Sequence, residues 1–144
     1  MVEVQFRFRD DEVVADPAVT VDAFGEQTNA VAVRLEPGDD ARDLLPYLDR
    51  LKLVEVTFPA FTDGRGYSSA RILREAGYAG ELRAVGDIGV DQLSHLKRVG
   101  FDAIAPEAEL NAEDATRAFA TWPEVYQATV VDGRQPIWAL RHGR

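Results

Sequence analysis

The sequence has 144 residues, 46% of them hydrophobic, with no cysteine and a formal net charge of −9. Its length and composition predict one globular domain over residues 1–144, and the missing cysteines exclude thiolate metal sites, cysteine nucleophiles and cysteine-ligated iron–sulfur clusters. The acidic charge argues against nucleic acid and anionic membrane surfaces as partners, because both require a basic face.

The chain begins with short strand patterns. Residues 2–8 alternate apolar and polar side chains, Asp10-Asp11 is typical of a turn, and Val13-Val14 follows as a second short strand. This order predicts an N-terminal β-hairpin. The first residues lack the basic and apolar regions of a signal peptide, and no apolar stretch approaches the roughly 18 residues that span a membrane. We therefore expect a cytoplasmic protein.

From residue 31 onward, strand and helix patterns alternate. Apolar runs predict four strands, at 31–35, 53–58, 82–85 and 101–104. Apolar residues at helical spacing predict a helix near 44–51, where Pro46 delays or bends the helix, and others at 67–76, at 90–99 and after Asn111. Gly77 and Gly100 are placed to end two of these helices.

This alternation predicts an α/β fold of repeated βα units around a parallel sheet. The sheet is either half-barrel-like or open and doubly wound, and the regular units without a dinucleotide fingerprint favour the half-barrel. Asp132-Gly133 between two apolar runs predicts a C-terminal β-hairpin. In either arrangement, ligands bind at the carboxyl ends of the strands.

The most distinctive loop lies between the second of these strands and its helix, near residues 58–71. Two glycines permit close approach of the backbone, and the start of the helix offers unpaired N–H groups. Hydroxyl side chains and a planar guanidinium complete the usual chemistry of an oxyanion site. The predicted anion loop consists of Thr62, Asp63, Gly64, Arg65, Gly66, Tyr67, Ser68 and Arg71. The alternative is a purely structural loop in which Asp63 or Ser68 caps the helix and Arg65 pairs with an acid.

A second loop follows the third strand, and the candidate residues there are Asp87, Asp91 and Gln92. Acids also stand at the other strand ends, in the set Glu36, Asp63, Asp87 and Glu107. Converging carboxylates could hold magnesium or act as an acid–base pair, although short acids more often cap helices. His95 is expected on a helix surface without metal-ligand company, so no histidine-based metal site is predicted and no residue is assigned as a metal ligand.

Charge is unevenly distributed along the chain. The segment from Phe58 to Arg83 carries four arginines and three acids, so it is close to neutral within an acidic protein. The simpler interpretation is that these arginines lie on solvated helix faces.

Several of these segments occur together in a known family. They are Phe58-Pro59, the run from Thr62 to Ser68, Ala70-Arg71, the run from Gly80 to Asp87, Asp91-Gln92-Leu93 and the run from Gly100 to Ala103. In combination they resemble an uncharacterised proteobacterial family, domain of unknown function 934, described as an oxidoreductase involved in sulfite reduction. The resemblance implies gene neighbours that encode assimilatory sulfite reductase and a sulfate-pathway reductase, and these are the implied partners.

Together these observations favour an accessory or binding protein of sulfite and sulfate reduction, which docks on a reductase or holds an oxyanion at Thr62–Ser69. The alternative is a small enzyme with a carboxylate or magnesium site at the strand ends. The residues identify no cofactor and no catalytic group, and the oxidoreductase label comes from the family alone. A homodimer is also expected, with the terminal hairpin and Trp138 at its seam.

Overall fold

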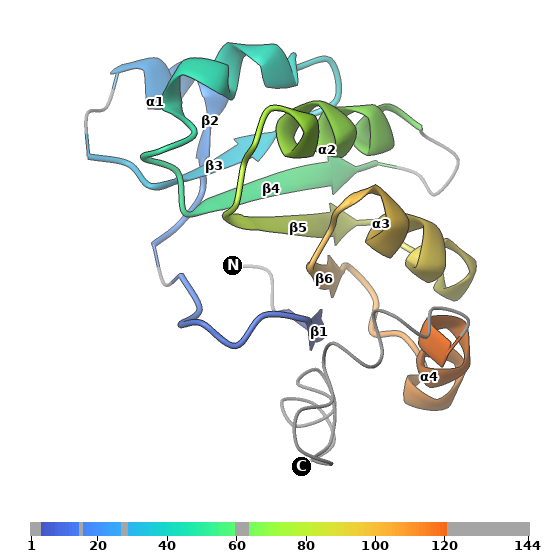
Figure 1. The fold of residues 1–144 in the computed structure, drawn as a ribbon. Coiled ribbons are helices and arrows are strands. Elements are labelled where there is room, and N and C mark those ends of the chain that lie inside the picture. The colour runs from blue at the N-terminus through green and yellow to red at the C-terminus, as the bar shows by residue number, and fades with distance from the viewer. Residues whose placement is uncertain (1–3, 15, 27–28, 60–63, 121–144) are drawn as a thin grey trace.

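The computed structural model describes residues 4–14, 16–26, 29–59 and 64–120 (Figure 1). Within these residues, six strands form one sheet in the order β1-β6-β5-β4-β3-β2. They are β1 Phe6–Arg7, β2 Val19–Thr20, β3 Ala32–Leu35, β4 Leu53–Phe58, β5 Glu81–Gly86 and β6 Ala103–Pro106. Strands β2 to β6 run parallel, and β1 joins β6 in the antiparallel direction.

The connections between the parallel strands are helical. They contain α1 Val21–Glu26, η1 Ala41–Tyr47, α2 Arg65–Glu75, and η2 Val90–Gln92 continued by α3 Leu93–Val99, while α4 Ala112–Ala120 follows β6. Each new parallel strand adds to the same side of the one before it, so right-handed crossovers place every connecting helix on one face. Figure 1 shows α1, α2 and α3 on the same side of the sheet. Of the two predicted arrangements, half-barrel-like and open doubly wound, the observed strand order is that of a half-barrel.

The hydrophobic core lies between this face and the helices. Along β4, Val54, Val56 and Phe58 belong to the core cluster, together with Leu73 of α2 and Leu96 of α3. Side chains alternate across a strand, so the residues between these three point to the other face of the sheet. That second face carries Glu55, an ion-paired carboxylate described below.

The four strands predicted from residue 31 onward are present, with small shifts at their ends. The strand predicted at 101–104 begins two residues later, at Ala103, because the backbone N–H of Phe101 still bonds the α3 carbonyl of Leu96 at 3.1 Å. The helix predicted near 44–51 is instead the 3₁₀ helix η1, which contains Pro46 and is capped by the Asp40 side chain at the backbone N–H of Arg42, at 2.9 Å. Gly77 and Gly100 adopt positive φ angles of 97° and 118°, as helix-ending glycines do.

The N-terminal hairpin is a prediction that the structure corrects. Strand β1 pairs with β6 and not with residues 13–14, which lie outside any strand. The reason is Arg7, whose guanidinium bonds the carbonyl oxygens of Arg9 and Asp11 and so folds the following segment back on itself. The predicted C-terminal hairpin and Trp138 lie outside the described residues.

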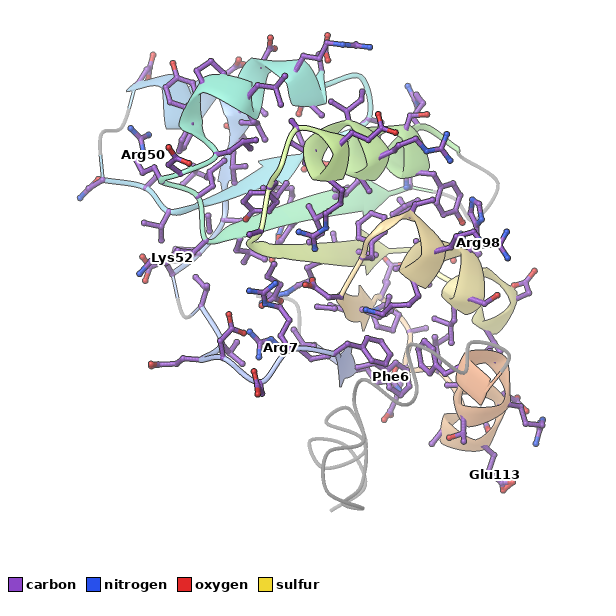
Figure 2. All side chains as sticks on the ribbon, viewed as in Figure 1. Phe6, Arg7, Arg50, Lys52, Arg98 and Glu113 are labelled. Atoms are coloured by element: carbon purple, nitrogen blue, oxygen red, sulfur yellow. The ribbon has the colours of Figure 1, made fainter. Side chains whose placement is uncertain are left out.

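The two residues of β1 point to opposite faces of the sheet (Figure 2). The Phe6 ring packs edge-on against Phe119 of α4, with 5.5 Å between centroids, whereas Arg7 enters the charged second face. Within the described ranges, no helix is both long and apolar enough to cross a membrane.

Candidate functional site

An open pocket of about 330 Å³ lies at the carboxyl ends of β3 and β4. Residues 35–41, from the last residue of β3 onward, form one wall. Val56 and Thr57 of β4 form the floor, and α2 supplies the other wall with Arg65, Gly66, Ser68, Ser69 and Ile72. This is the edge at which parallel α/β sheets bind ligands. It is also the place that the sequence predicted for the anion loop.

The α2 wall carries hydrogen-bond donors. Gly64 is the N-cap of α2 and has no side chain to bond the first-turn N–H groups, and the first turn contains no acid. Gly66 is buried against the Phe58 ring, and a Cβ at this position would lie 2.5 Å from a ring carbon. The glycine therefore lets α2 begin directly against the end of β4.

The opposite wall is acidic, but two of its three carboxylates have structural partners. Asp39 accepts the backbone N–H of Glu36 at 2.8 Å, and Asp40 accepts the backbone N–H of Arg42 at 2.9 Å. Glu36 itself is half-buried. The pocket therefore has a donor wall on α2 and an acceptor wall on the loop after β3.

A second group of polar residues lies between α2 and η2. The Gln92 Nε2 atom donates to the Tyr67 hydroxyl at 2.9 Å, and the Gly89 backbone N–H donates to Gln92 Oε1 at 2.7 Å. The Tyr67 ring packs on Phe58 and on His95, with centroid distances of 5.3 and 4.4 Å. The structure thus joins Tyr67 of the first predicted loop to Gln92 of the second.

The other predicted site residues are distributed differently. Thr62 and Asp63 lie outside the described residues. Arg71 is exposed on α2 and is not part of the pocket wall, and Asp87 and Asp91 are exposed on the second loop. His95 is exposed on α3, as predicted.

In the described part of the chain, no three histidine or acidic side chains converge as a metal site would require. Of the predicted strand-end acids, Glu36, Asp87 and Glu107 follow different strands, and Asp40 and Asn111 act as helix caps in their place. Neighbours of the predicted acids, and not the acids themselves, therefore cap η1 and α4.

The largest feature that the sequence analysis missed is a row of charges on the second face of the sheet. Strand register aligns Arg34, Glu55 and Arg83, and then Ala103 and Arg7, across five neighbouring strands. Glu55 accepts from Arg34 Nη2 at 2.8 Å and from Arg83 Nη1 at 3.2 Å. Arg83 and Glu55 are 4% and 5% exposed, so the prediction of solvated arginines is wrong for Arg83.

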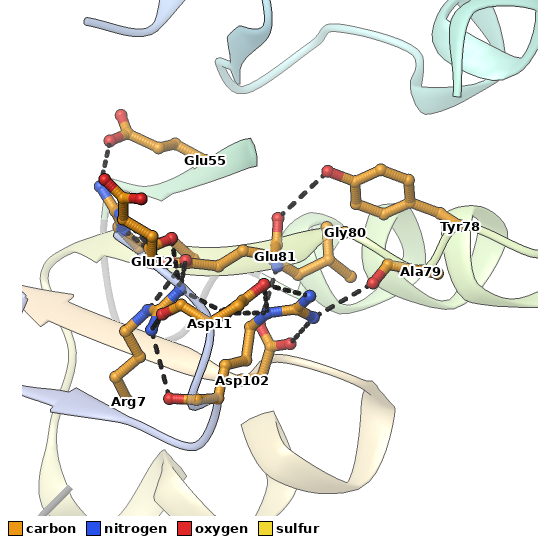
Figure 3. A network of polar contacts seen from close by, with 12 residues as sticks. Arg7, Asp11, Glu12, Glu55, Tyr78, Ala79, Gly80, Glu81 and Asp102 are labelled. Carbon is orange, nitrogen blue, oxygen red and sulfur yellow. Dashed lines mark hydrogen bonds and ion pairs between the residues drawn. The ribbon is translucent and has the colours of Figure 1, made fainter. Parts of the chain in front are cut away.

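Glu81 completes this ion network (Figure 3). Its Oε2 accepts Nη2 of Arg83 at 2.9 Å, and its Oε1 accepts Nη2 of Arg7 at 2.8 Å. Both Glu81 and Arg7 are 1% exposed. The sequence did contain a signal for this network, since charged residues interrupt otherwise apolar strand runs. Charged side chains are buried in proteins only when they are paired.

A second branch of the network lies around Asp102. Its carboxylate accepts from Arg9 at 2.8 Å and from Arg74 at 3.2 Å, while its other oxygen accepts the backbone N–H of Leu82 at 2.9 Å. Burial raises the pKa of nearby Tyr78, and the positive charge of Arg74 offsets this only in part. Burial likewise lowers the pKa of Arg74, against the attraction of Asp102. Arg74 is thus a structural residue and not part of an exposed arginine patch.

The fold and pocket define a singly wound α/β protein with a ligand-sized pocket at the carboxyl edge of its sheet. More particularly, the chain belongs to the family described as bacterial protein of unknown function (DUF934), whose model matches residues 32–138. The match covers the pocket, the Tyr67–Gln92 pair and most of the charged row, but it begins after β1 and β2. No curated protein and no solved structure matches the chain.

Proposed function

We propose that this protein is an accessory binding protein of assimilatory sulfite and sulfate reduction, and that a small oxyanion binds in the pocket at the first turn of α2. The pathway is suggested by the link to sulfite reduction that the sequence resemblance implies for this family. The pocket at the carboxyl edge supports the binding role.

The observation that carries the proposal is the donor wall of the pocket. Arg65, Ser68 and Ser69 line it beside the start of an 11-residue helix whose N-cap is a glycine. Backbone N–H groups, hydroxyls and a guanidinium are the donors that bind sulfur and phosphorus oxyanions in proteins. The helix dipole adds partial positive charge at the same point.

The acidic wall determines which oxyanion fits best. Glu36 and the loop carboxylates repel a dianion such as sulfate, because they carry the same charge. Sulfite is partly protonated near neutral pH, so a hydrogen sulfite ion has less charge and can donate one hydrogen bond to the acceptor wall. The proposal therefore includes a preference for sulfite over sulfate.

Partner docking belongs to the same proposal. An accessory protein that holds sulfite must release it to, or receive it from, a reductase, so the carboxyl edge of the sheet is the face expected to meet that enzyme. This edge contains the pocket and the Tyr67–Gln92 pair.

Calorimetric titration with sodium sulfite and sodium sulfate tests the proposal. Arg65→Ala should weaken sulfite binding about tenfold, because a charge-assisted hydrogen bond contributes roughly 1.5–3 kcal/mol. Arg71→Ala is the matched control, because it removes the same charge from the exposed surface of the same helix outside the pocket. Equal losses in the two variants would indicate a general charge effect, and absence of binding to the unsubstituted protein would refute the proposal.

A further inference from the structure

The pair formed by Tyr67 and Gln92 is not part of the pocket wall. We infer that the Tyr67 hydroxyl is a hydrogen-bond donor to an acceptor ligand, a small oxyanion or carboxylate, between α2 and η2, and that Gln92 is a positioning residue that sets the direction of this hydroxyl. The site goes beyond the proposed pocket, because Tyr67 faces α3 while the pocket faces η1.

The Gln92 amide has one orientation that its neighbours can satisfy. The Gly89 backbone N–H, which can only donate, lies 2.7 Å from Gln92 Oε1. The opposite orientation would bring the amide NH₂ group against this N–H, two donors face to face. The oxygen of Gln92 therefore points to Gly89, and its nitrogen points to Tyr67.

Gln92 Nε2 lies 2.9 Å from the Tyr67 hydroxyl and can only donate, so the hydroxyl oxygen is the acceptor of this bond. The phenolic hydrogen must then point away from Gln92. Among the described residues, no acceptor bonds that hydrogen, and it is available to a ligand.

The Tyr67 side chain and its partner Gln92 are held in place by packing. Gln92 is 6% exposed, and the Tyr67 ring is held between Phe58 and His95, with 5.3 and 4.4 Å between centroids. A donor held in one direction loses little conformational entropy when it binds. Tyr67 is in the first turn of α2, and helix side chains lean toward the N-terminal end. The hydroxyl is consequently presented at the ligand-binding edge of the sheet.

The ligand class follows from the donor. A phenolic O–H donates one hydrogen bond, and its strongest partners are charged oxygen acceptors. The His95 imidazole beside the ring is a second group with which such an acceptor could interact. A small anion with an exposed oxygen, such as sulfite or acetate, has the required chemistry.

Two variants separate the donor from its positioning residue. Tyr67→Phe removes the hydroxyl and keeps the ring between Phe58 and His95. Gln92→Glu keeps an oxygen for the Gly89 N–H but replaces the donor NH₂ by an acceptor, so the Tyr67 hydroxyl would turn to donate to residue 92. Tyr47→Phe is the control, because Tyr47 is 40% exposed on η1, away from this pair.

The experiment is an NMR titration of the labelled full chain with sodium sulfite and, separately, with sodium acetate. We expect the Tyr67 ring signals to shift and saturate with at least one anion. Tyr67→Phe and Gln92→Glu should each weaken that binding about tenfold, and the double variant should be no weaker than either single variant. Tyr47→Phe should leave binding unchanged.

Three results would overturn the inference: unshifted Tyr67 signals with both anions, unchanged affinity in Tyr67→Phe, or unchanged affinity in Gln92→Glu. Signals of Ser69 and Ile72 report the pocket separately, since both residues line it. Shifts at those two residues without shifts at Tyr67 would overturn this inference and leave the pocket proposal standing. Shifts at Tyr67 without shifts at Ser69 and Ile72 would count against the pocket proposal and leave this inference standing.

Discussion

Arg7 reaches across a neighbouring strand to Glu81. Their strands, β1 and β5, are separated by β6, yet Arg7 Nη2 lies 2.8 Å from Glu81 Oε1. On β6, the strand between them, Ala103 is the register partner of both Arg7 and Arg83. Its small side chain leaves room for the guanidinium to pass, so the ion network extends from β3 to the N-terminal segment without a break.

We expect Glu81→Gln to be strongly destabilising. The change leaves Arg7 and Arg83 buried with one acidic partner fewer, and breaking a buried ion pair costs about 3 kcal/mol or more. Urea denaturation measures the loss in free energy of unfolding. Arg117→Ala, at an ion pair in which the two side chains are 71% and 47% exposed, is the control and should cost less than about 1 kcal/mol. Similar costs for the two variants would contradict a structural role for the network.

Arg7→Ala should release the segment that follows β1. Arg7 holds this segment through the carbonyl oxygens of Asp11 and Glu12, at 2.6 and 3.4 Å. Without these bonds, a glutamate-specific protease should cut after Glu12 much faster than in the unsubstituted protein. Asp10→Ala, at an exposed neighbouring position, should not change the rate. Equal rates in all three proteins would mean that Arg7 does not hold the segment.

Two glycine-to-alanine substitutions should change the stability of the protein in opposite directions. Alanine is favoured over glycine in a helix by up to about 1 kcal/mol, so Gly25→Ala in α1 should stabilise the protein, because nothing lies within 4 Å of the new Cβ. Gly66→Ala should destabilise it by about 1–3 kcal/mol, since its Cβ would lie 2.5 Å from the Phe58 ring. Thermal unfolding of both variants measures the difference. A stabilising Gly66→Ala would show that α2 does not pack closely on β4.

Tyr78 should resist ionisation in the folded protein. Burial raises the pKa of Tyr78 above its usual value of 10.0. Because the folded state favours the neutral phenol, the associated stability is complete below about pH 10 and is lost as the pH rises further. Phenolate absorbance during an alkaline titration should show a late step that coincides with unfolding and is missing in Tyr78→Phe. Simultaneous ionisation of all four tyrosines in the folded protein would contradict this.

The strands and most helix ends could be predicted because their signals are local. The strand predicted at 53–58 has the same bounds as β4. Gly77 and Gly100 end helices through positive φ angles, as predicted. Strand β2 was not predicted because Val19–Thr20 is too short to show the alternation of apolar and polar residues. This segment becomes a strand through its pairing with β3. Helix α1 was not predicted either, and it has only six residues.

The ion network and the Tyr67–Gln92 pair could not be predicted from one sequence for a different reason. Strand register decides which charged side chains share a face, and Arg7 and Glu81 are 74 residues apart. Tyr67 and Gln92 were each singled out by their loops, but their contact depends on the packing of α2 beside α3. Sequence reasoning pointed to the edge of the sheet at which the pocket lies, but it could not determine which side chains meet there.

A crystal structure of the protein grown with sodium sulfite tests the central claim most directly. The account predicts an anion in the pocket, within hydrogen-bond distance of the first-turn N–H groups of α2 and the Ser68 hydroxyl, and a lower occupancy of that anion in Arg65→Ala. A pocket filled only by water in the unsubstituted protein, at sulfite concentrations that saturate it in the calorimeter, would contradict the account.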